Sequence, residues 1–352
     1  MYVCGPGPAL KWFESYLMGR KQSVKIGYTS SAPHQLRYSV PQGSVLEPQL
    51  FSVSSAPLGK IIKRHGLERH FYADDSQVYF SVSPLQSDFD DKIKIVLICI
   101  NEIRGWMIAN FLKNNDEKLE IILFGSPQQL KKLKLDSIII GDATVLPATV
   151  VKNLGVLEDS NFTMVQHINR MRSLAYLQLR DISRIRAFLS QKNTEKLVHA
   201  FVTSRLDIGN TLLYRLPDKE LYRLQTIQNH AARVVTRTAR YEHISPVLRK
   251  LHWLPIKQRI NFKILVLAYK SLRDMAPLYI SELITHLELR SGLRSATRGQ
   301  LEQPRSSSCW GDRAFSHAAP FLWNKLPFAI KEKPTLSSFK SSLKTFIFNH
   351  PL

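Results

Sequence analysis

This sequence of 352 residues contains few cysteines and no long apolar run. The three cysteines, Cys4, Cys99 and Cys309, are far apart, and none belongs to a Cys/His cluster with zinc spacing. No apolar run approaches the roughly 18 residues that a membrane helix needs, and the N-terminus lacks a basic-then-apolar signal pattern. We therefore expect a soluble intracellular protein with reduced thiols and no membrane partner.

Acidic residues are scarce in the second half of the chain. Residues 1–160 carry 18 Lys and Arg against 16 Asp and Glu, whereas residues 161–352 carry 31 against 12. Nearly all of the net charge of +21 therefore lies after residue 160. Such an excess of cations favours phosphate-bearing partners, although a basic surface that serves only solubility is the alternative.

The hydrophobic pattern changes character near residue 160. Before it, helices and short strands alternate, which predicts an α+β fold with antiparallel pairing. The helices are expected at 8–18, from about 44 to 64 and at 86–109, and the strands at 22–28, 35–40, 67–73, 76–82, 118–125, 135–140, 144–146 and 151–157. After it the pattern is helical, at 162–189, 193–208, 218–238, 244–251, 256–273, 277–288 and 335–348. Residues 290–312, rich in Ser, Gly and Arg, predict an exposed loop.

Two adjacent carboxylates stand between two β-prone runs. Asp74 and Asp75 are expected at the tip of the hairpin formed by 67–73 and 76–82. Adjacent aspartates in a turn are usually only solvated, because Asp is a good turn former. Two carboxylates at a strand junction can also bind Mg²⁺, which takes one or two carboxylates together with substrate phosphates. Two such ions can activate a 3′-hydroxyl and stabilise a leaving pyrophosphate.

Two further segments carry candidate ligand contacts. The Pro41-Gln42-Gly43-Ser44 turn opens a helix, where a glycine lets the backbone approach a ligand and N–H groups point at phosphate. Lys118 precedes a predicted strand, where it can meet a triphosphate or protonate a leaving group. An ordinary helix entry and a solvated surface lysine are the respective alternatives.

Four segments in this order resemble the reverse transcriptase of non-LTR (LINE-like) retrotransposons. They are Val40–Ser44, Tyr72–Asp75, Asn110–Lys113 with Lys118-Leu119-Glu120, and Leu154-Gly155-Val156. Three segments of the basic half are also similar to those polyproteins, namely Leu197–Asp207, Leu251–Ile256 and Trp310–Phe315. The resemblance implies a partial polymerase palm, an antiparallel sheet with helices, in residues 1–160. It further implies a thumb-like helical domain in 161–240 and a basic, mostly α-helical C-terminal region in 241–352.

The resemblance also implies roles for individual residues. Asp74 becomes the principal metal-binding acid and Asp75 its partner, with Lys118 as a further catalytic residue. The nucleotide or template contacts would be Gln42, Gly43, Ser44, Tyr72 and Ala73, and the primer grip would be Leu154, Gly155 and Val156. The implied cofactor is Mg²⁺ or Mn²⁺. The implied partners are an RNA template, a DNA primer or RNA/DNA hybrid, and deoxynucleoside triphosphates.

The predicted helix at 162–189 carries arginines among apolar residues at helical spacing, which fits a thumb helix facing a duplex backbone. The candidate backbone contacts are Arg170, Arg172, Arg180, Arg184 and Arg186. A solvated basic face is the alternative.

The chain departs from the family pattern in two ways. In the family, another palm strand with an earlier metal-binding aspartate precedes the segments seen here, and glycine stands where this chain has Glu47. We expect a carboxylate there to repel triphosphate or distort the turn, and the chain alone to be catalytically incomplete. Two other interpretations stay open, a non-catalytic RNA- or DNA-binding protein that uses the basic half, and a non-functional retroelement relic.

Overall fold

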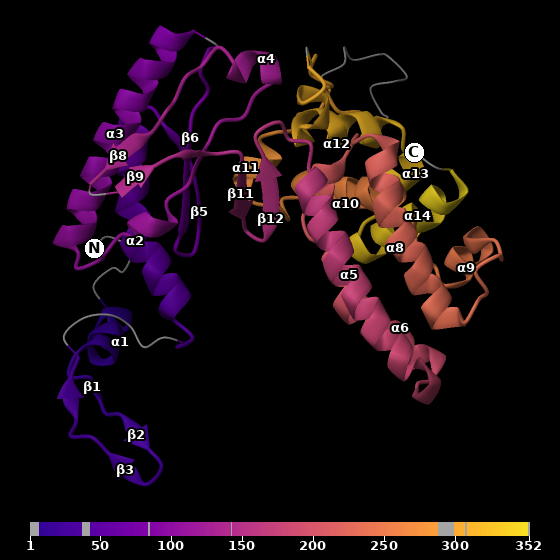
Figure 1. Ribbon diagram of the computed structural model, residues 1–352, viewed down its shortest axis with the longest axis horizontal. Coiled ribbons are helices and arrows are strands. Elements are labelled where there is room, and N and C mark those ends of the chain that lie inside the picture. Colours follow the sequence, from indigo (N-terminus) through magenta and orange to yellow (C-terminus); the bar gives the residue numbers. More distant parts are fainter. Residues whose placement is uncertain are drawn as a thin grey trace. The chain divides into compact units, whose positions relative to one another are not determined.

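The computed structural model describes residues 7–36, 43–83, 85–141, 143–287, 299–306 and 308–350. The chain separates into two compact units, Met1–Ala148 and Thr149–Leu352 (Figure 1). Helices and short, mostly antiparallel ladders are mixed, which confirms the predicted α+β class. The finer division at residues 160 and 240 stays a prediction. No helix of the described residues has both the length and the apolar character that crossing a bilayer requires.

The first unit begins with one helix and two small ladders. Helix α1 (Pro8–Leu17) is followed by β1 (Lys21–Gln22), which pairs antiparallel with β4 (His34–Gln35). Inside this pair, β2 (Lys25–Ile26) pairs antiparallel with β3 (Thr29–Ser30). All eight strand residues are exposed, so these ladders contribute little to a core.

The centre of the first unit is a hairpin between two helices in sequence. Helix α2 (Glu47–Arg64) precedes β5 (Glu68–Tyr72) and β6 (Asp75–Tyr79), and α3 (Gln86–Ala109) follows. The α2 residues Leu58, Ile61 and Ile62 share one helical face and are buried. They pack in one cluster with Cys99 of α3 and with Val78 of β6. The hairpin and both helices were predicted from these local periodicities and are confirmed.

Helix α3 buries a second apolar face. Ile93, Leu97 and Ile100 pack against the hairpin of β8 (Ile138–Ile140) and β9 (Ala143–Val145), which lies beside α3 in Figure 1. In the sequence, α3 and β8 are connected by η1 (Asp116–Lys118), β7 (Ile121–Ile122) and α4 (Pro127–Leu130). The strand β10 (Pro147–Ala148) ends the unit. β7 pairs with β10 in parallel, so the expectation of antiparallel pairing throughout was wrong here.

The second unit opens with an antiparallel hairpin of β11 (Val150–Asn153) and β12 (Val156–Asp159) and is otherwise helical. Helix α5 (Val165–Ile185) runs beside α8 (Asp218–Thr236) (Figure 1). The connection between them comprises η2 (Arg186–Phe188), α6 (Gln191–Val198), a π-helical turn η3 (His199–Thr203), α7 (Ser204–Asp207) and η4 (Asn210–Leu213). The remaining elements are α9 (Ile244–Lys250), α10 (Ile256–Ser271), α11 (Leu278–Ser281), η6 (Gly311–Arg313), α12 (Phe315–Asn324), α13 (Phe328–Lys331) and α14 (Leu336–Asn349).

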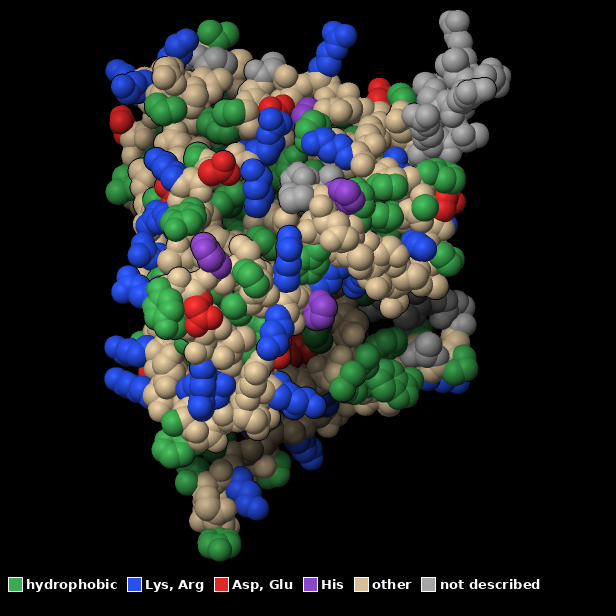
Figure 2. Space-filling model, turned by 90° about the vertical axis from the view of Figure 1, so that its right-hand side faces the viewer, with side chains coloured by type: hydrophobic (Ala, Val, Ile, Leu, Met, Phe, Trp, Pro, Cys, Tyr) green, Lys and Arg blue, Asp and Glu red, His purple; other side chains and the backbone are tan. Residues whose placement is uncertain are grey.

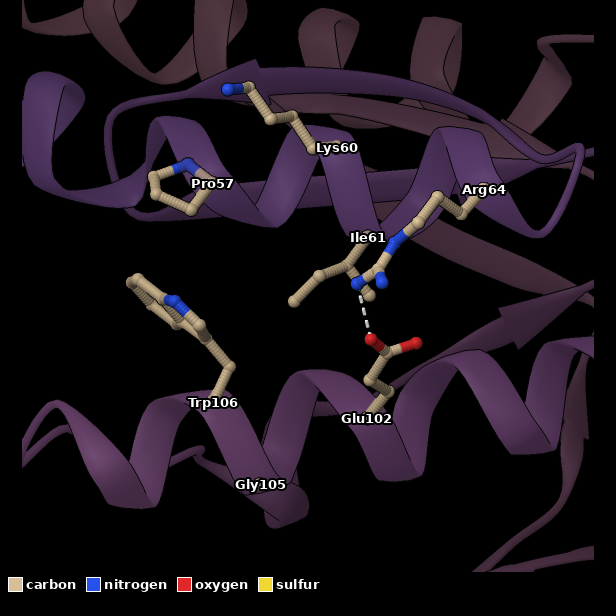
Figure 3. Close-up of a pocket in the computed structure, with 7 residues that line it drawn as sticks. All are labelled: Pro57, Lys60, Ile61, Arg64, Glu102, Gly105 and Trp106. Carbon is tan, nitrogen blue, oxygen red and sulfur yellow. Dashed lines mark hydrogen bonds and ion pairs between the residues drawn. The ribbon is translucent and has the colours of Figure 1, made fainter. Parts of the chain in front are cut away.

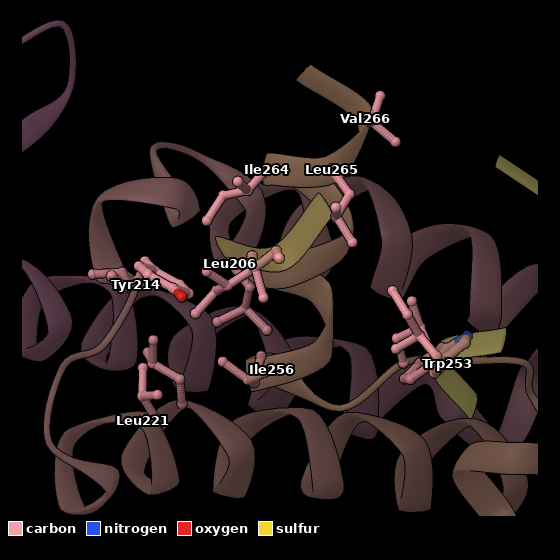
Figure 4. Packing of buried hydrophobic residues seen from close by; sticks show 14 of the residues in the cluster. Leu206, Tyr214, Leu221, Trp253, Ile256, Ile264, Leu265 and Val266 are labelled. Atoms are coloured by element: carbon pink, nitrogen blue, oxygen red, sulfur yellow. The ribbon is translucent and has the colours of Figure 1, made fainter. Parts of the chain in front are cut away.

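One hydrophobic core runs through the whole second unit, from Val156 to Ile347. Helix α10 packs against α8, which precedes residue 240 in the sequence. It also packs against α12 and α14, which follow residue 240. Figure 4 shows Leu206 and Tyr214 close to Ile264 of α10. Residues 161–240 and residues 241–352 therefore share one core.

Residues 290–312 were expected to form an exposed loop, and the described part of this segment is exposed only at some positions. Residues 288–298 and 307 lie outside the described residues. Glu302–Arg305 are exposed, but Leu301 is buried and forms a β-bridge with His286. The Asn324 side chain accepts a hydrogen bond from the Leu301 amide and donates one to its carbonyl, both at 2.8 Å. This contact belongs to α12, a helix that the sequence did not predict.

Candidate functional site

Asp74 and Asp75 lie at the tip of the β5–β6 hairpin. Tyr72 pairs with Asp75 across the ladder, so Ala73 and Asp74 form a two-residue loop. Ala73 takes a left-handed backbone with φ of 54°. Both aspartates are exposed, and no side chain of the described residues forms a hydrogen bond or ion pair with either carboxylate. Their oxygens are therefore available to an external cation.

The hairpin is a two-stranded sheet with an open face. Among the described residues, no third strand pairs with β5 or β6. One face packs on α2, and the other carries the exposed Tyr72 and Tyr79 together with Asp75. The described residues hold no group of three or more His, Cys, Asp and Glu that could bind a metal ion. Two carboxylates match the oxygen ligands that Mg²⁺ prefers but fill only part of its coordination shell.

The turn before α2 is closed by Glu47. Gly43 has φ of 84°, and its N–H donates to Glu47 Oε2 at 2.5 Å. A carboxylate in the first helical turn is also favoured by the helix dipole. Glu47 thus occupies a backbone donor that the resemblance assigns to nucleotide binding. Ser44 is half-buried and its hydroxyl has no partner among the described residues, while Gln42 lies outside them.

Lys118 ends the 3₁₀ turn η1 rather than preceding a long strand. Its side chain is exposed, and no contact within the described residues joins it to Asp74 or Asp75. Asp116 of the same turn pairs instead with Arg104 at 3.0 Å. The first unit therefore contains all three predicted catalytic residues without a direct contact between the lysine and the acids.

Leu154, Gly155 and Val156 form the tip of the β11–β12 hairpin. Asn153 pairs with Val156, and the two loop residues between them, Leu154 and Gly155, both have positive φ, at 44° and 89°. A two-residue turn with positive φ at both positions has a backbone twist that matches the twist of the two strands. Glycine adopts positive φ without strain, which explains its presence at position 155. Val156 is buried in the core of the second unit, whereas Leu154 is half exposed. The predicted primer-grip segment is thus a tight hairpin turn that is joined to the core of this unit through Val156.

Two buried polar side chains connect this hairpin to α5. Asp159 accepts hydrogen bonds from the amides of Thr163 at 2.9 Å and Met164 at 2.6 Å, which satisfies free donors at the start of α5. His167 of α5 accepts a hydrogen bond at Nδ1 from the Leu157 amide at 3.3 Å. An amide N–H needs an unprotonated acceptor, so this contact requires neutral His167.

We expect the stability of the second unit to fall as the pH drops below about 6.5, the ordinary pKa of histidine. Burial lowers the pKa of His167, and the charge of Arg170 acts in the same direction. The unfolded chain then binds more protons than the folded one below that pH, which favours unfolding. The urea midpoint at about pH 7.5 and 5.5 tests this, with His167→Gln as the comparison because its amide oxygen can still accept the bond. An identical pH dependence in both chains would contradict the assignment.

Four of the five predicted backbone-binding arginines are exposed on α5. They are Arg170, Arg172, Arg180 and Arg184. The Arg172 guanidinium lies 5.7 Å from the centre of the Tyr176 ring, and Asp181 lies within 3.8 Å of both Arg180 and Arg184. Figure 2 shows Lys and Arg side chains over one face of the molecule with few acidic side chains between them.

Arg186 has a different environment from the other four. Its guanidinium donates to the carbonyls of Val234 at 2.8 Å, Val235 at 2.9 Å and Leu189 at 2.6 Å. The first two carbonyls belong to the last turn of α8, where they lack partners within the helix. Arg186 therefore caps α8, a role that the sequence did not indicate because the contact spans about 48 residues.

The three segments of the basic half that resembled the family hold the second unit together. Arg313 donates to the carbonyls of Phe162 at 2.7 Å and Leu212 at 2.9 Å. Asp207 forms an ion pair with Arg259 at the start of α10, and Trp253 Nε1 donates to Glu195 at 3.4 Å. The sequence indicated these three segments through the resemblance but did not identify the partners of their residues.

Comparison with known proteins finds no family model and no solved structure that matches. The chain is similar to two curated Drosophila melanogaster proteins. It is 26% identical over 262 residues to a probable RNA-directed DNA polymerase from transposon X-element, and 24% identical over 271 residues to one from transposon BS. Each match covers 73% of this chain but 28% of the relative, so the chain spans about a quarter of their length. These similarities confirm the predicted resemblance to reverse transcriptases of LINE-like elements.

Proposed function

We propose that this chain, a relative of reverse transcriptases of LINE-like elements, supplies part of the palm and thumb of an RNA-directed DNA polymerase. The observation that carries the proposal is the pair of exposed, unpartnered carboxylates at the tip of the β5–β6 hairpin, backed by α2. The substrates would be deoxynucleoside triphosphates and a DNA primer on an RNA template, or an RNA/DNA hybrid.

Within this function the residues of the chain have separate roles. Asp74 and Asp75 would hold Mg²⁺ or Mn²⁺, which when bound supplies activation of the primer 3′-hydroxyl and stabilisation of the pyrophosphate. Tyr72 and Ala73, next to these acids, would lie against the primer end. Lys118 would offer its ammonium group to the triphosphate. The hairpin turn at Leu154, Gly155 and Val156 would position the primer strand.

We further propose that nucleotidyl transfer needs a carboxylate from outside the described residues. Two exposed aspartates leave most of the coordination shell of two ions unfilled. Glu47 adds a negative charge beside the Gly43 amide, where it competes with a triphosphate for the same donor. This chain by itself is then a catalytically incomplete polymerase.

A primer-extension assay on a primed RNA template tests both proposals. We expect this chain alone to give no extension above background with Mg²⁺ or Mn²⁺. A polypeptide that adds the upstream palm strand and fingers of a relative is expected to extend the primer. Asp74→Ala should abolish that activity, because it removes a metal ligand, whereas Asp136→Ala, an exposed acid of the same unit, should preserve it.

The two possible failures of this assay have different meanings. Extension by this chain alone that is abolished by Asp74→Ala would overturn the incompleteness. Extension by the longer polypeptide that survives Asp74→Ala would overturn the palm assignment.

Nucleic-acid binding without catalysis is a second candidate function. Two observations favour it. Residues 161–352 contain 31 Lys and Arg but only 12 Asp and Glu, and four arginines of α5 are exposed. Binding of this kind releases counterions and weakens steeply with salt.

Replacement of Arg170, Arg172, Arg180 and Arg184 by Gln is expected to weaken binding to RNA and DNA. The slope of log affinity against log salt should also fall by about 0.7 to 0.9 for each phosphate that the protein no longer neutralises. Gel retardation at several salt concentrations measures both quantities. The matched control replaces four exposed cations elsewhere in the unit, Lys219, Arg249, Lys250 and Lys340. Equal weakening in the two variants would show a diffuse charge effect rather than an α5 surface.

A further inference from the structure

A pocket of about 710 Å³ lies between α2 and α3 of the first unit (Figure 3). Pro57 of α2 and Trp106 of α3 face each other at one end. Arg64 and Glu102 form an ion pair at the other end, and Ile61 lies between. No residue of the acid-tipped hairpin lines this pocket, so it is distinct from the candidate polymerase site.

The pocket combines an aromatic wall with two cations. Trp106 is half-buried, which holds the indole in place while leaving part of it accessible. Gly105 precedes it, and a side chain built there would meet nothing within 4 Å, so the space above the helix is open. Lys60 is exposed and pairs with no side chain of the described residues. The second cation, Arg64, is paired with Glu102. An indole with a lysine and an arginine nearby is the combination that binds single-stranded nucleic acid, because a base stacks while its phosphate meets the charge.

Glu102 is the one acid of the pocket, and its charge is already balanced. Its carboxylate pairs with Arg64 and accepts from His65 Nε2 at 2.8 Å. The hydrogen bond from His65 and the charge of Arg64 lower the pKa of Glu102. The side chain of Arg64 is 65% exposed, and such an exposed pair contributes little energy. Arg64 can therefore reach a phosphate without a large energetic cost.

We propose that this pocket is a second nucleic-acid site of the first unit. A single-stranded RNA or DNA places one base on the Trp106 indole and the adjacent phosphate between Lys60 and Arg64. The pocket has the size of an ordinary small-ligand site, which accommodates one nucleotide. This site holds a strand without acting on it and does not depend on catalysis at Asp74 and Asp75.

Photocrosslinking of the full chain tests the proposal. The probes are single-stranded oligonucleotides with bromouracil, as RNA and as DNA. After irradiation and tryptic digestion, we expect an adduct on Trp106 within the peptide Gly105–Lys113. Lys60→Gln should lower its yield about threefold or more, because the glutamine carries no charge to neutralise the phosphate. Lys63→Gln is the matched control, since Lys63 is an exposed lysine of the same helix outside the pocket.

The results separate this site from the basic second unit. An adduct on Trp106 that survives replacement of the four α5 arginines and declines only in Lys60→Gln supports the proposal. Adducts confined to residues 149–352 would overturn it, while leaving nucleic-acid binding by the second unit intact. Equal declines in Lys60→Gln and Lys63→Gln would also overturn it, because they would indicate unspecific charge.

Discussion

A fragment that ends at Arg240 is expected to lose the fold of the second unit altogether. Among the described residues, its core contains 40 buried hydrophobic residues, and 21 of them lie beyond residue 240. Helix α10 is central, because it packs against α8, α12 and α14. Burial of each large side chain stabilises a fold by roughly 1.5–3 kcal/mol. A typical domain has only about 5–15 kcal/mol of net stability, so helices that lose half of their shared core lose the burial that offsets their own ordering entropy.

Circular dichroism and urea unfolding of two fragments measure this effect. Residues 149–352 should unfold cooperatively, whereas residues 149–240 should show no cooperative transition and should aggregate through the α8 residues that α10 covers. A cooperative transition of the shorter fragment would show instead that residues 161–240 form a thumb domain of their own.

Replacement of Arg313 by Met should destabilise the second unit by about 3 kcal/mol. The guanidinium holds the Phe162 and Leu212 carbonyls, and a hydrogen bond from a charged group contributes about 1.5–3 kcal/mol. Methionine keeps much of the apolar stem but cannot donate. The substitution affects the contact between η6 and the start of α5. The two segments of this contact lie far apart in the sequence.

The measurement is the free energy of unfolding from urea titration. Arg305→Met is the control, because Arg305 is an exposed arginine nearby in the sequence and its side chain has no partner among the described residues. Equal stability of the two variants would mean that solvent satisfies both carbonyls and that Arg313 is dispensable for the fold.

The elements of the first unit were largely predictable. The α2 and α3 periodicities and the β-prone runs around Asp74 depend on neighbours two to four residues apart, so the sequence alone locates the hairpin and its acids. The apolar residues Ile93, Leu97 and Ile100 of α3 were predicted to share a face, but their packing against β8 was not, because Ile138 and Ile140 lie about 40 residues beyond Ile100. The parallel β7–β10 pair escaped prediction for the same reason.

Polar contacts were the least predictable part of the candidate site. Glu47 was expected to repel triphosphate or distort the turn at Gly43, and its hydrogen bond from the Gly43 amide was not predicted. Arg186 was grouped with the exposed arginines, although it caps α8. Both roles depend on which donor or acceptor lies nearby, and composition or periodicity does not contain that information.

The sequence by itself determined the relationship to transposon polymerases, the order of α2, β5, β6 and α3 and the adjacency of Asp74 and Asp75, because all three depend on short segments. Only the tertiary structure decided that residues 149–352 share one core and that the Trp310–Phe315 segment holds it together. Arg313 and Phe162 are 151 residues apart, and a contact over such a separation forms only when the packed helices bring its two ends together.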